Sequence, residues 1–414
     1  MIDYSRLPSA AEKNISVRVK GAAERAIQQG HPWVFEDAIL RQSHLGNAGD
    51  LAVIYDRDKN NFLAVGLYDP LSPIRIKVLQ ALQPMRIDRA FFAEKLKAAQ
   101  AKRQPLINDG TTGYRLVHGE SDGFPALVID RYGDMLALKL YTTAWLPHLE
   151  ALIGALEDSI VFDGLVLRLS RALQSDRLNV AKLYGLADGQ QLIGTGADEP
   201  VAFVENGLLF QADLRRGHKT GFFFDQRENR QQARELAQGR RVLDVFSYTG
   251  AFSVYALAGG ARSVTALDIS EPALDALKVN VERNGFDAEQ VDALAVDAFA
   301  GMMELIEARR KFSLAVVDPP AFANSRASMR KAVLAYRRLV EMALRLLAND
   351  GLLVMASCSS RIKAEMFFQL VERSAEVSGY QLEDVLKTGH GLDHPVGFPE
   401  AAYLKALFAR VRRS

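Results

Sequence analysis

Between Arg241 and Cys358, short apolar stretches alternate with longer amphipathic ones, and this alternation limits the folds open to the chain more than any other feature. The apolar stretches predict strands at 242–246, 263–267, 291–296, 312–317 and 352–357, and the stretches between them predict helices. Strands that alternate with helices of this length indicate a parallel, doubly wound α/β sheet. Ligands bind such sheets at the carboxyl ends of the strands, so the residues there are the first candidates for a functional site.

A polar residue lies at or near the end of each predicted strand. These residues are Asp244, Asp268, Asp297, Asp318 and Cys358. Because the carboxyl ends of parallel strands meet at one edge of a sheet, we expect the five side chains to converge. Their convergence is stronger evidence for a site than any single motif is.

The turn after the first strand, Ser247–Gly250, predicts the kind of ligand. Strand, turn and helix N-terminus make the first half of a βαβ unit, in which backbone N–H groups face the ligand. Asp268, 24 residues after Asp244, stands where such folds bind a ribose diol. The turn has one glycine and lacks those that admit a pyrophosphate, so S-adenosyl-L-methionine, an adenosine ligand without phosphates, is the expected cofactor. The alternative is an ordinary α/β turn with no ligand.

The segment Arg215–Arg230 places many polar donors around three phenylalanines directly before the first strand. We predict a flap that closes over cofactor or substrate, with polar contacts from Lys219, Gln226 and Arg227. The alternative is a linker whose phenylalanines anchor it to the domain. The full set of expected cofactor contacts is Lys219, Gln226, Arg227, Asp244, Phe246, Tyr248, Thr249, Gly250, Asp268, Asn280 and Asp297.

The last two strand ends carry the residues expected to do chemistry. Two prolines stiffen the backbone after Asp318, and a rigid acceptor of this kind can hold a flipped-out base. Carbon 5 of cytosine is a weak nucleophile, but a thiolate that adds to carbon 6 activates it while a carboxylic acid supports nitrogen 3. We therefore predict Cys358 and Asp318 as catalytic residues, and Pro319, Pro320 and Phe322 as substrate contacts. The alternative for Cys358 is a small core residue.

The chain before residue 207 divides into two smaller predicted domains. Closely spaced short strands in residues 1–75 predict a small β-barrel, and the helices and strands of residues 76–206 predict an α+β domain. The strand–helix domain then spans residues 207–414. Trp33 in the first domain either contacts RNA as a substrate-binding residue or fills the core of the barrel.

The composition limits partners and location. The 51 basic residues nearly cancel the 50 acidic ones, so any contact with RNA must come from a local basic groove. The single cysteine excludes an internal disulfide framework and a thiolate zinc cage. No apolar run reaches membrane-spanning length and no signal-peptide core is visible at the N-terminus, which predicts a cytoplasmic protein that does not contact a membrane.

Four motifs resemble a known family. They are His218-Lys-Thr-Gly-Phe-Phe-Phe-Asp-Gln-Arg227, Asp244-Val-Phe-Ser-Tyr-Thr-Gly250, Asp318-Pro-Pro-Ala-Phe322 and Ser357-Cys-Ser359. With the closing Asp393-His-Pro-Val and Tyr403-Leu-Lys segments, they resemble the RlmI-type large-subunit ribosomal RNA cytosine-5 methyltransferases over nearly the whole chain. The resemblance implies an N-terminal PUA domain, a central α+β domain, a C-terminal Rossmann-like domain that uses S-adenosylmethionine, ribosomal RNA as partner and Cys358 as nucleophile.

The family resemblance leaves three functions open. The first is methylation of cytosine carbon 5 through Cys358. The second is methylation of an exocyclic amine or of guanine by Asp318-Pro-Pro-Ala-Phe alone, since close relatives with this turn modify guanine. The third is a ribosome-assembly factor that binds RNA without turnover. The Asp318-Pro-Pro turn has no second cysteine to help release the product, so another base must do so. The sequence specifies no oligomeric state.

Overall fold

The computed structural model describes residues 2–57, 60–175, 178, 180–322 and 328–413. The chain divides into two compact units. The first comprises Met1–Phe203, Ala212–Phe222 and Leu392–Pro399, and the second comprises Val204–Gln211, Phe223–Gly391 and Glu400–Ser414. In the described part of the chain, no helix combines the length and the apolar character needed to cross a membrane.

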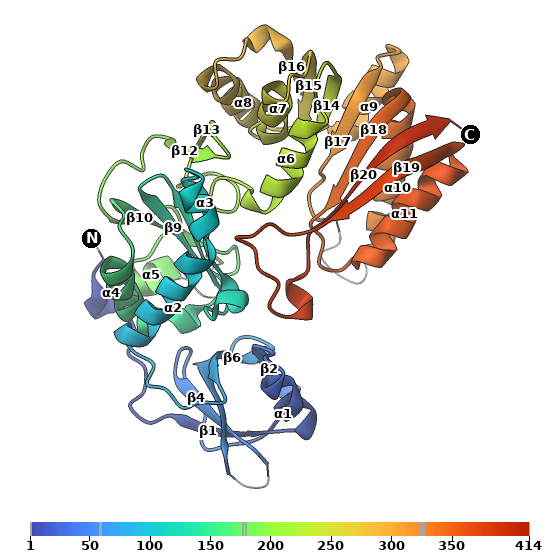
Figure 1. The fold of residues 1–414 in the computed structure, drawn as a ribbon. Coiled ribbons are helices and arrows are strands. Elements are labelled where there is room, and N and C mark those ends of the chain that lie inside the picture. Colours follow the sequence, from blue (N-terminus) through green and yellow to red (C-terminus); the bar gives the residue numbers. More distant parts are fainter. Residues whose placement is uncertain (1, 58–59, 176–177, 179, 323–327, 414) are drawn as a thin grey trace. The chain divides into compact units, whose positions relative to one another are not determined.

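The first unit begins with a six-stranded sheet, shown in blue in Figure 1. Its strands run in the order β2-β6-β5-β4-β1-β3. Alternate side chains of β1 point into the core, as expected for a strand with one buried face. The last strand continues to Ala81, beyond the predicted domain end at residue 75. The elements are β1 (Ile15–Val19), α1 (Gly21–Gln28), β2 (Trp33–Phe35), β3 (Ile39–Gln42), β4 (Leu51–Tyr55), β5 (Phe62–Tyr68) and β6 (Ile74–Ala81).

A five-stranded sheet in the order β11-β10-β9-β8-β7 follows in the same unit. It comprises β7 (Gly113–His118), β8 (Leu127–Tyr132), β9 (Met135–Leu140), β10 (Gly164–Leu169) and β11 (Gln191–Ile193), accompanied by α2 (Arg89–Lys102), α3 (Gln104–Asn108), α4 (Leu149–Ser159) and α5 (Val180–Tyr184). The C-terminal segment Leu392–Pro399 belongs here, because the buried Arg103 guanidinium binds both Asp122 and the Asp393 carbonyl oxygen. The predicted α+β character of this region is confirmed.

The second unit is built on a seven-stranded sheet in the order β16-β15-β14-β17-β18-β20-β19. The five strands from β16 to β18 are parallel, as predicted. Figure 1 shows α10 and α11 running beside the strands from β17 to β19. The elements are α6 (Arg227–Glu235), β14 (Arg241–Val245), α7 (Ala251–Ala258), β15 (Ser263–Asp268), α8 (Glu271–Arg283), β16 (Val291–Ala295), α9 (Ala298–Glu307), β17 (Phe312–Val317), α10 (Met329–Leu346), β18 (Leu347–Ser357), α11 (Ala364–Val377), β19 (Tyr380–Thr388) and β20 (Lys405–Arg413).

Two strands of this sheet were not predicted. β20 pairs with β18 and with β19, antiparallel in both cases, so the sheet is mixed. β18 also begins at Leu347 and not at residue 352, with an irregular register opposite Phe312–Leu314.

Two further strands, β12 (Val201–Glu205) and β13 (Leu208–Ala212), form a separate two-stranded sheet.

A fully buried ion pair fixes the helices that lead to the site. The Arg230 guanidinium donates to both carboxylate oxygens of Glu205, at 2.6 and 2.7 Å. The Tyr255 hydroxyl donates to the same carboxylate at 2.9 Å, which connects α6 to α7. Because removal of one partner would leave a buried charge, this pair strongly favours one arrangement of the two helices.

Candidate active site

The turn after β14 is held by its backbone. Phe246, Tyr248 and Gly250 all have positive φ, at 66°, 49° and 75°. The N–H groups of Phe246 and Ser247 donate to the Leu267 carbonyl oxygen at 2.9 and 3.0 Å, so β15 fixes the first half of the turn. Gly250 is required twice, because its φ is left-handed and because a Cβ there would collide with the side chain of Leu277.

Asp268 connects the ends of β14 and β15. One carboxylate oxygen accepts the Tyr248 N–H at 2.8 Å and the other accepts the Ser270 N–H at 2.9 Å. The residue is half-buried. Each carboxylate oxygen has a further lone pair, so Asp268 can hold the turn and also accept ribose hydroxyls.

Two hydroxyls of the turn are buried but not used by the protein. Ser247 and Thr249 are each 7% exposed, and neither hydroxyl has a hydrogen-bond partner among the described residues. Buried polar groups are normally hydrogen-bonded, so two unsatisfied hydroxyls in one turn indicate a polar ligand. The residues present therefore fit an adenosine-type cofactor beside Asp268.

Three predicted cofactor contacts have structural partners in the protein. The fully buried Asn280 donates from Nδ2 to the Thr249 carbonyl oxygen and accepts the Gln211 N–H, both at 3.0 Å. Asp297 is exposed and caps α9 by accepting two backbone N–H groups. Asp244 accepts the Ser253 hydroxyl at 2.6 Å, and burial raises the pKa of this carboxyl to about 7. Their contact with the cofactor stays a prediction.

The predicted flap, Arg215–Arg230, is shared between the two units. Lys219 lies in the first unit, where its carbonyl oxygen accepts Lys139 Nζ at 2.9 Å. Gln226 and Arg227 lie in the second unit and are buried, and Gln226 Oε1 accepts Nδ2 of Asn229. Two of the three phenylalanines are buried, as the linker interpretation expects. The flap itself stays a prediction.

Cys358 and the Asp318-Pro-Pro turn lie together at the ends of β17 and β18. The thiol Sγ is 4.0 Å from the Pro319 carbonyl oxygen, and both Asp318 and Cys358 are partly exposed. The Asp318 N–H donates to the Val245 carbonyl oxygen at 3.3 Å, which connects this turn to β14. Pro319 is buried and Pro320 is exposed. Cys358 is therefore not a core residue, and it lies beside the acid-bearing turn.

Aromatic and hydroxyl side chains support this pair. The ring of Phe322 lies 6.4 Å from that of Phe246 and 5.3 Å from that of Tyr336. The Tyr336 hydroxyl donates to the buried Ser357 Oγ at 2.8 Å. Burial raises the pKa of Tyr336, so it remains a neutral donor. Phe322 thus anchors the turn, and its contact with a substrate stays a prediction.

Lys405 is a neighbour of Cys358 to which the sequence analysis gave no role. Its Nζ donates to the carbonyl oxygens of Ser359 and Tyr403. From the sequence, a lysine at the start of a strand is expected at the surface. The antiparallel pairing of β20 with β18 places Lys405 next to the end of β18. The Tyr403-Leu-Lys motif was the available signal.

Trp33 lies in the first unit, in an aromatic cluster with His31, Phe35 and Phe398. Its indole N–H donates to Glu120 at 2.9 Å. The side chain is half-buried and is not among the buried residues that form the core of the N-terminal sheet. Contact with RNA stays a prediction.

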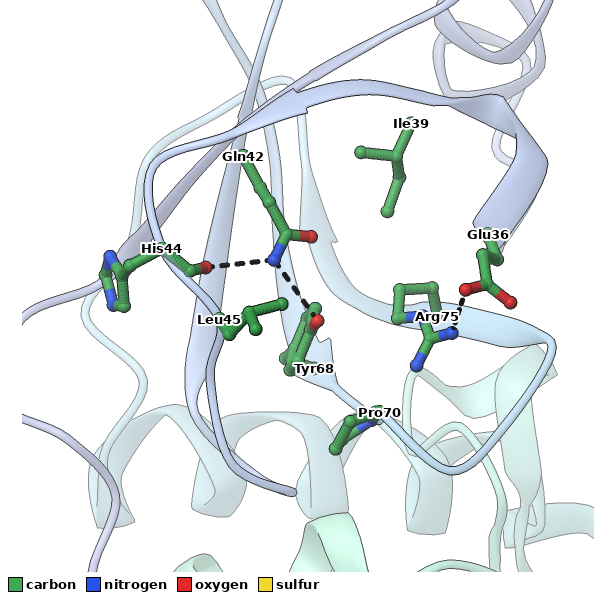
Figure 2. Close-up of a pocket in the computed structure, with 8 residues that line it drawn as sticks. All are labelled: Glu36, Ile39, Gln42, His44, Leu45, Tyr68, Pro70 and Arg75. Carbon is green, nitrogen blue, oxygen red and sulfur yellow. Dashed lines mark hydrogen bonds and ion pairs between the residues drawn. The ribbon is translucent and has the colours of Figure 1, made fainter.

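A separate pocket with a volume of about 510 Å³ lies in the N-terminal domain. Figure 2 shows the residues that line it. Its polar groups bind one another: Gln42 donates to the Tyr68 hydroxyl and the His44 carbonyl oxygen, and Arg75 pairs with Glu36. The pocket contains none of the strand-end residues. Its lining consists of Glu36, Ile39, Gln42, His44, Leu45, Tyr68, Pro70 and Arg75.

Matches to family models and to full-length relatives agree on one family for this chain. Residues 115–410 match the S-adenosylmethionine-dependent methyltransferase family, and residues 17–81 match the PUA-like domain family. The ribosomal RNA large subunit methyltransferase of Deinococcus radiodurans is 42% identical over 98% of this chain and 99% of its own. The ribosomal RNA large subunit methyltransferase I of Aeromonas salmonicida is 38% identical over 95% of this chain and 98% of its own.

The fold is shared with a solved structure. A SAM-dependent methyltransferase from Streptococcus mutans superimposes with a TM-score of 0.80 at 22% identity, covering 95% of this chain and 99% of that one. The match confirms the predicted Rossmann-like methyltransferase architecture. The chain thus belongs to the S-adenosylmethionine-dependent methyltransferases, in the family of the ribosomal RNA large subunit methyltransferases.

Proposed function

We propose that this enzyme methylates carbon 5 of a cytosine in large-subunit ribosomal RNA through a covalent adduct on Cys358. The observation that carries the proposal is the 4.0 Å approach of the thiol to Pro319, which brings a nucleophile and the Asp318 carboxyl to adjacent strand ends. The names of the full-length relatives support large-subunit ribosomal RNA as substrate.

The cofactor belongs at the turn after β14. S-adenosylmethionine supplies an electrophilic methyl group when bound. Asp268 would accept the ribose hydroxyls, and Ser247 and Thr249 would contribute hydroxyls that have no partner among the described residues. Two buried side chains stabilise this turn: Asp244 accepts the Ser253 hydroxyl, and Asn280 donates to the Thr249 carbonyl oxygen.

Cys358 and Asp318 would share the chemistry. The thiolate adds to carbon 6, a C–S bond forms, and electron density moves toward carbon 5 and nitrogen 3, where Asp318 supports the developing charge. S-adenosylmethionine would supply the methyl group that carbon 5 accepts, with the cofactor sulfur as leaving group. Transfer of the carbon-5 proton to a base other than a second cysteine then re-forms the ring double bond, and the C–S bond breaks to release the Cys358 thiolate. This covalent route divides one difficult step into easier ones.

The N-terminal PUA-like domain would bind the RNA. A protein with a net charge of +1 has no strong overall attraction to RNA, so affinity must come from local contacts and stacking. The cluster of Trp33, His31, Phe35 and Phe398 offers aromatic surface for stacking, and Phe35 is 42% exposed.

Identification of the modified nucleoside tests the proposal. Unmodified large-subunit ribosomal RNA, transcribed in vitro, is incubated with the enzyme and S-adenosylmethionine carrying a labelled methyl group, then digested and separated by mass spectrometry. The proposal predicts label in 5-methylcytidine alone. Label in a methylated guanosine or an N-methylated nucleoside would favour amine or guanine chemistry at the Asp318 turn, and absence of label would favour an assembly factor.

A further inference from the structure

Lys405 occupies an unusual position for a lysine. It is 2% exposed and lies opposite Ser357 in the antiparallel pairing of β20 with β18. Its ammonium donates to the carbonyl oxygens of Ser359 and Tyr403, the latter at 2.9 Å. Lys405 therefore contacts both residues that flank Cys358 in sequence: Ser357 through the strand pairing and Ser359 through its ammonium group.

In the described part of the chain, no carboxylate balances the charge of Lys405. No ion pair joins it to an acidic side chain in the described residues, whereas the other buried lysine, Lys77, pairs with Asp69 at 2.7 Å. Buried lysines are rarely left without a charged partner, because desolvation of the ammonium is costly. The position calls for a negative group, and none of the described residues supplies it as a carboxylate.

Cys358 is the group that meets this need. Burial lowers the pKa of Lys405 to about 8, and the charge of Cys358 opposes that change. The interaction is reciprocal, so an ammonium that is stabilised by a thiolate stabilises that thiolate by the same free energy. At pH 7, which is below this pKa, most molecules have Lys405 in the protonated, positively charged form.

The other titratable groups around this pair do not supply such a charge. Tyr336 is a neutral donor, bonded to Ser357. In the proposed mechanism Asp318, at the next strand end, acts as a carboxylic acid and so supplies no negative charge. Next to Lys405 in sequence, the Tyr403 hydroxyl donates to Asp225. His390 Nε2 accepts the backbone N–H groups of Tyr403 and Leu404.

We propose that the Lys405 ammonium stabilises the Cys358 thiolate and is therefore the residue that activates the nucleophile. The inference rests on the proposed role of Cys358 in methyl transfer. Lys405 acts through the cysteine, so it is a positioning residue and need not contact the RNA base. The proton leaves the thiol for solvent, and Lys405 keeps its own.

The single cysteine allows a direct test without RNA or cofactor. The rate of alkylation by iodoacetamide is measured by intact mass between pH 6 and 10 for the native protein, Lys405→Gln and Lys405→Arg. Glutamine keeps hydrogen-bond donors but loses the charge, and arginine keeps both. Lys387→Gln is the matched control, because Lys387 lies on the neighbouring strand β19 and pairs with Glu372.

We expect the alkylation midpoint of Lys405→Gln to lie about one pH unit above that of the native protein, with Lys405→Arg and Lys387→Gln close to native. Methylation by Lys405→Gln should fall about tenfold at pH 7 and recover at higher pH. For the native protein alone, an alkylation midpoint at or above about pH 8.5, the usual thiol pKa, would contradict the inference. Equal midpoints for folded Lys405→Gln and native protein would also overturn it.

The two proposals can fail separately. If Lys405→Gln shifts the midpoint but Cys358→Ala still methylates RNA, the charge coupling stands and the covalent mechanism is wrong. If Cys358→Ala is inactive but Lys405→Gln has a native midpoint, the mechanism stands and Lys405 is only a structural residue.

Discussion

The turns after β14 and β18 lie at the same edge of one sheet, yet their polar groups are used in opposite ways. After β14, the backbone and Asp268 satisfy one another and the hydroxyls of Ser247 and Thr249 have no partner among the described residues. After β18, the hydroxyl of Ser357 binds both Tyr336 and the Ser359 N–H. The first turn is prepared to receive a ligand, whereas the second is rigidly bonded around one reactive atom.

This difference predicts that substitutions separate cofactor binding from chemistry. Cys358→Ala should remove methylation below detection, because the adduct cannot form, while affinity for S-adenosylmethionine and the melting temperature stay close to native. Initial rates, calorimetry and thermal unfolding check the three quantities. Product formation at the native rate would contradict the role of the thiolate.

Asp244 should give the largest effect on stability. Its folded pKa of about 7 lies above the usual 3.8, so the folded state holds more protons in that range and stability falls as pH rises from about 4 to about 7. Asp244→Asn removes this dependence and should be more stable than native protein at pH 8 by about 2–4 kcal/mol. Urea unfolding at several pH values checks this, and a native protein with flat stability over that range would contradict it.

Asp268 should control cofactor affinity. Asp268→Ala removes the proposed acceptor for the ribose and the acceptor for the Tyr248 N–H, so affinity for S-adenosylmethionine should fall at least about tenfold, or about 1.4 kcal/mol. Calorimetry on the folded variant measures the change. Asp287→Ala is the matched control, because it removes a carboxylate that caps a helical turn and has no predicted contact with the cofactor. Unchanged affinity in Asp268→Ala would place the ribose elsewhere.

The smallest effects should distinguish the hydroxyls of the two turns. Thr249→Val removes an unsatisfied hydroxyl, so stability should change by less than about 0.5 kcal/mol while cofactor affinity falls by about 1 kcal/mol. Ser357→Ala removes a bonded hydroxyl and should lower stability by about 1–3 kcal/mol with cofactor affinity unchanged. Identical behaviour of the two variants would show that the contrast between the turns is not real.

The sequence predicted the parallel part of the sheet because each of its five strands is a short, mostly apolar run with an acidic or thiol residue at or near its end. It missed β19, whose side chains are mostly exposed and lack a clear apolar face, and β20, whose partner β18 precedes it by some fifty residues. Antiparallel pairing over that separation leaves no local pattern. The position of Lys405 depends on this pairing, so its link to Cys358 could not be predicted.

The site was predicted as a convergence of strand ends, and in the structure the Cys358 thiol lies 4.0 Å from the carbonyl oxygen of Pro319, the residue after Asp318. Individual roles were harder to predict, because sequence does not show which polar atoms are already bonded. Asn280 and Asp297 were predicted as cofactor contacts, and both also bind the backbone of the protein, so their contact with the cofactor stays a prediction. The unsatisfied hydroxyls of Ser247 and Thr249 became visible only once burial was known.

Covalent trapping tests the central claim most directly. RNA that carries 5-fluorocytosine at the target position cannot lose a proton from carbon 5, so the adduct should persist through denaturation. With native enzyme and S-adenosylmethionine, we predict a cross-linked species whose peptide map places the RNA on Cys358, and no such species with Cys358→Ala. A native enzyme that releases methylated fluorinated RNA without a cross-link, or a cross-link at another residue, would contradict the account.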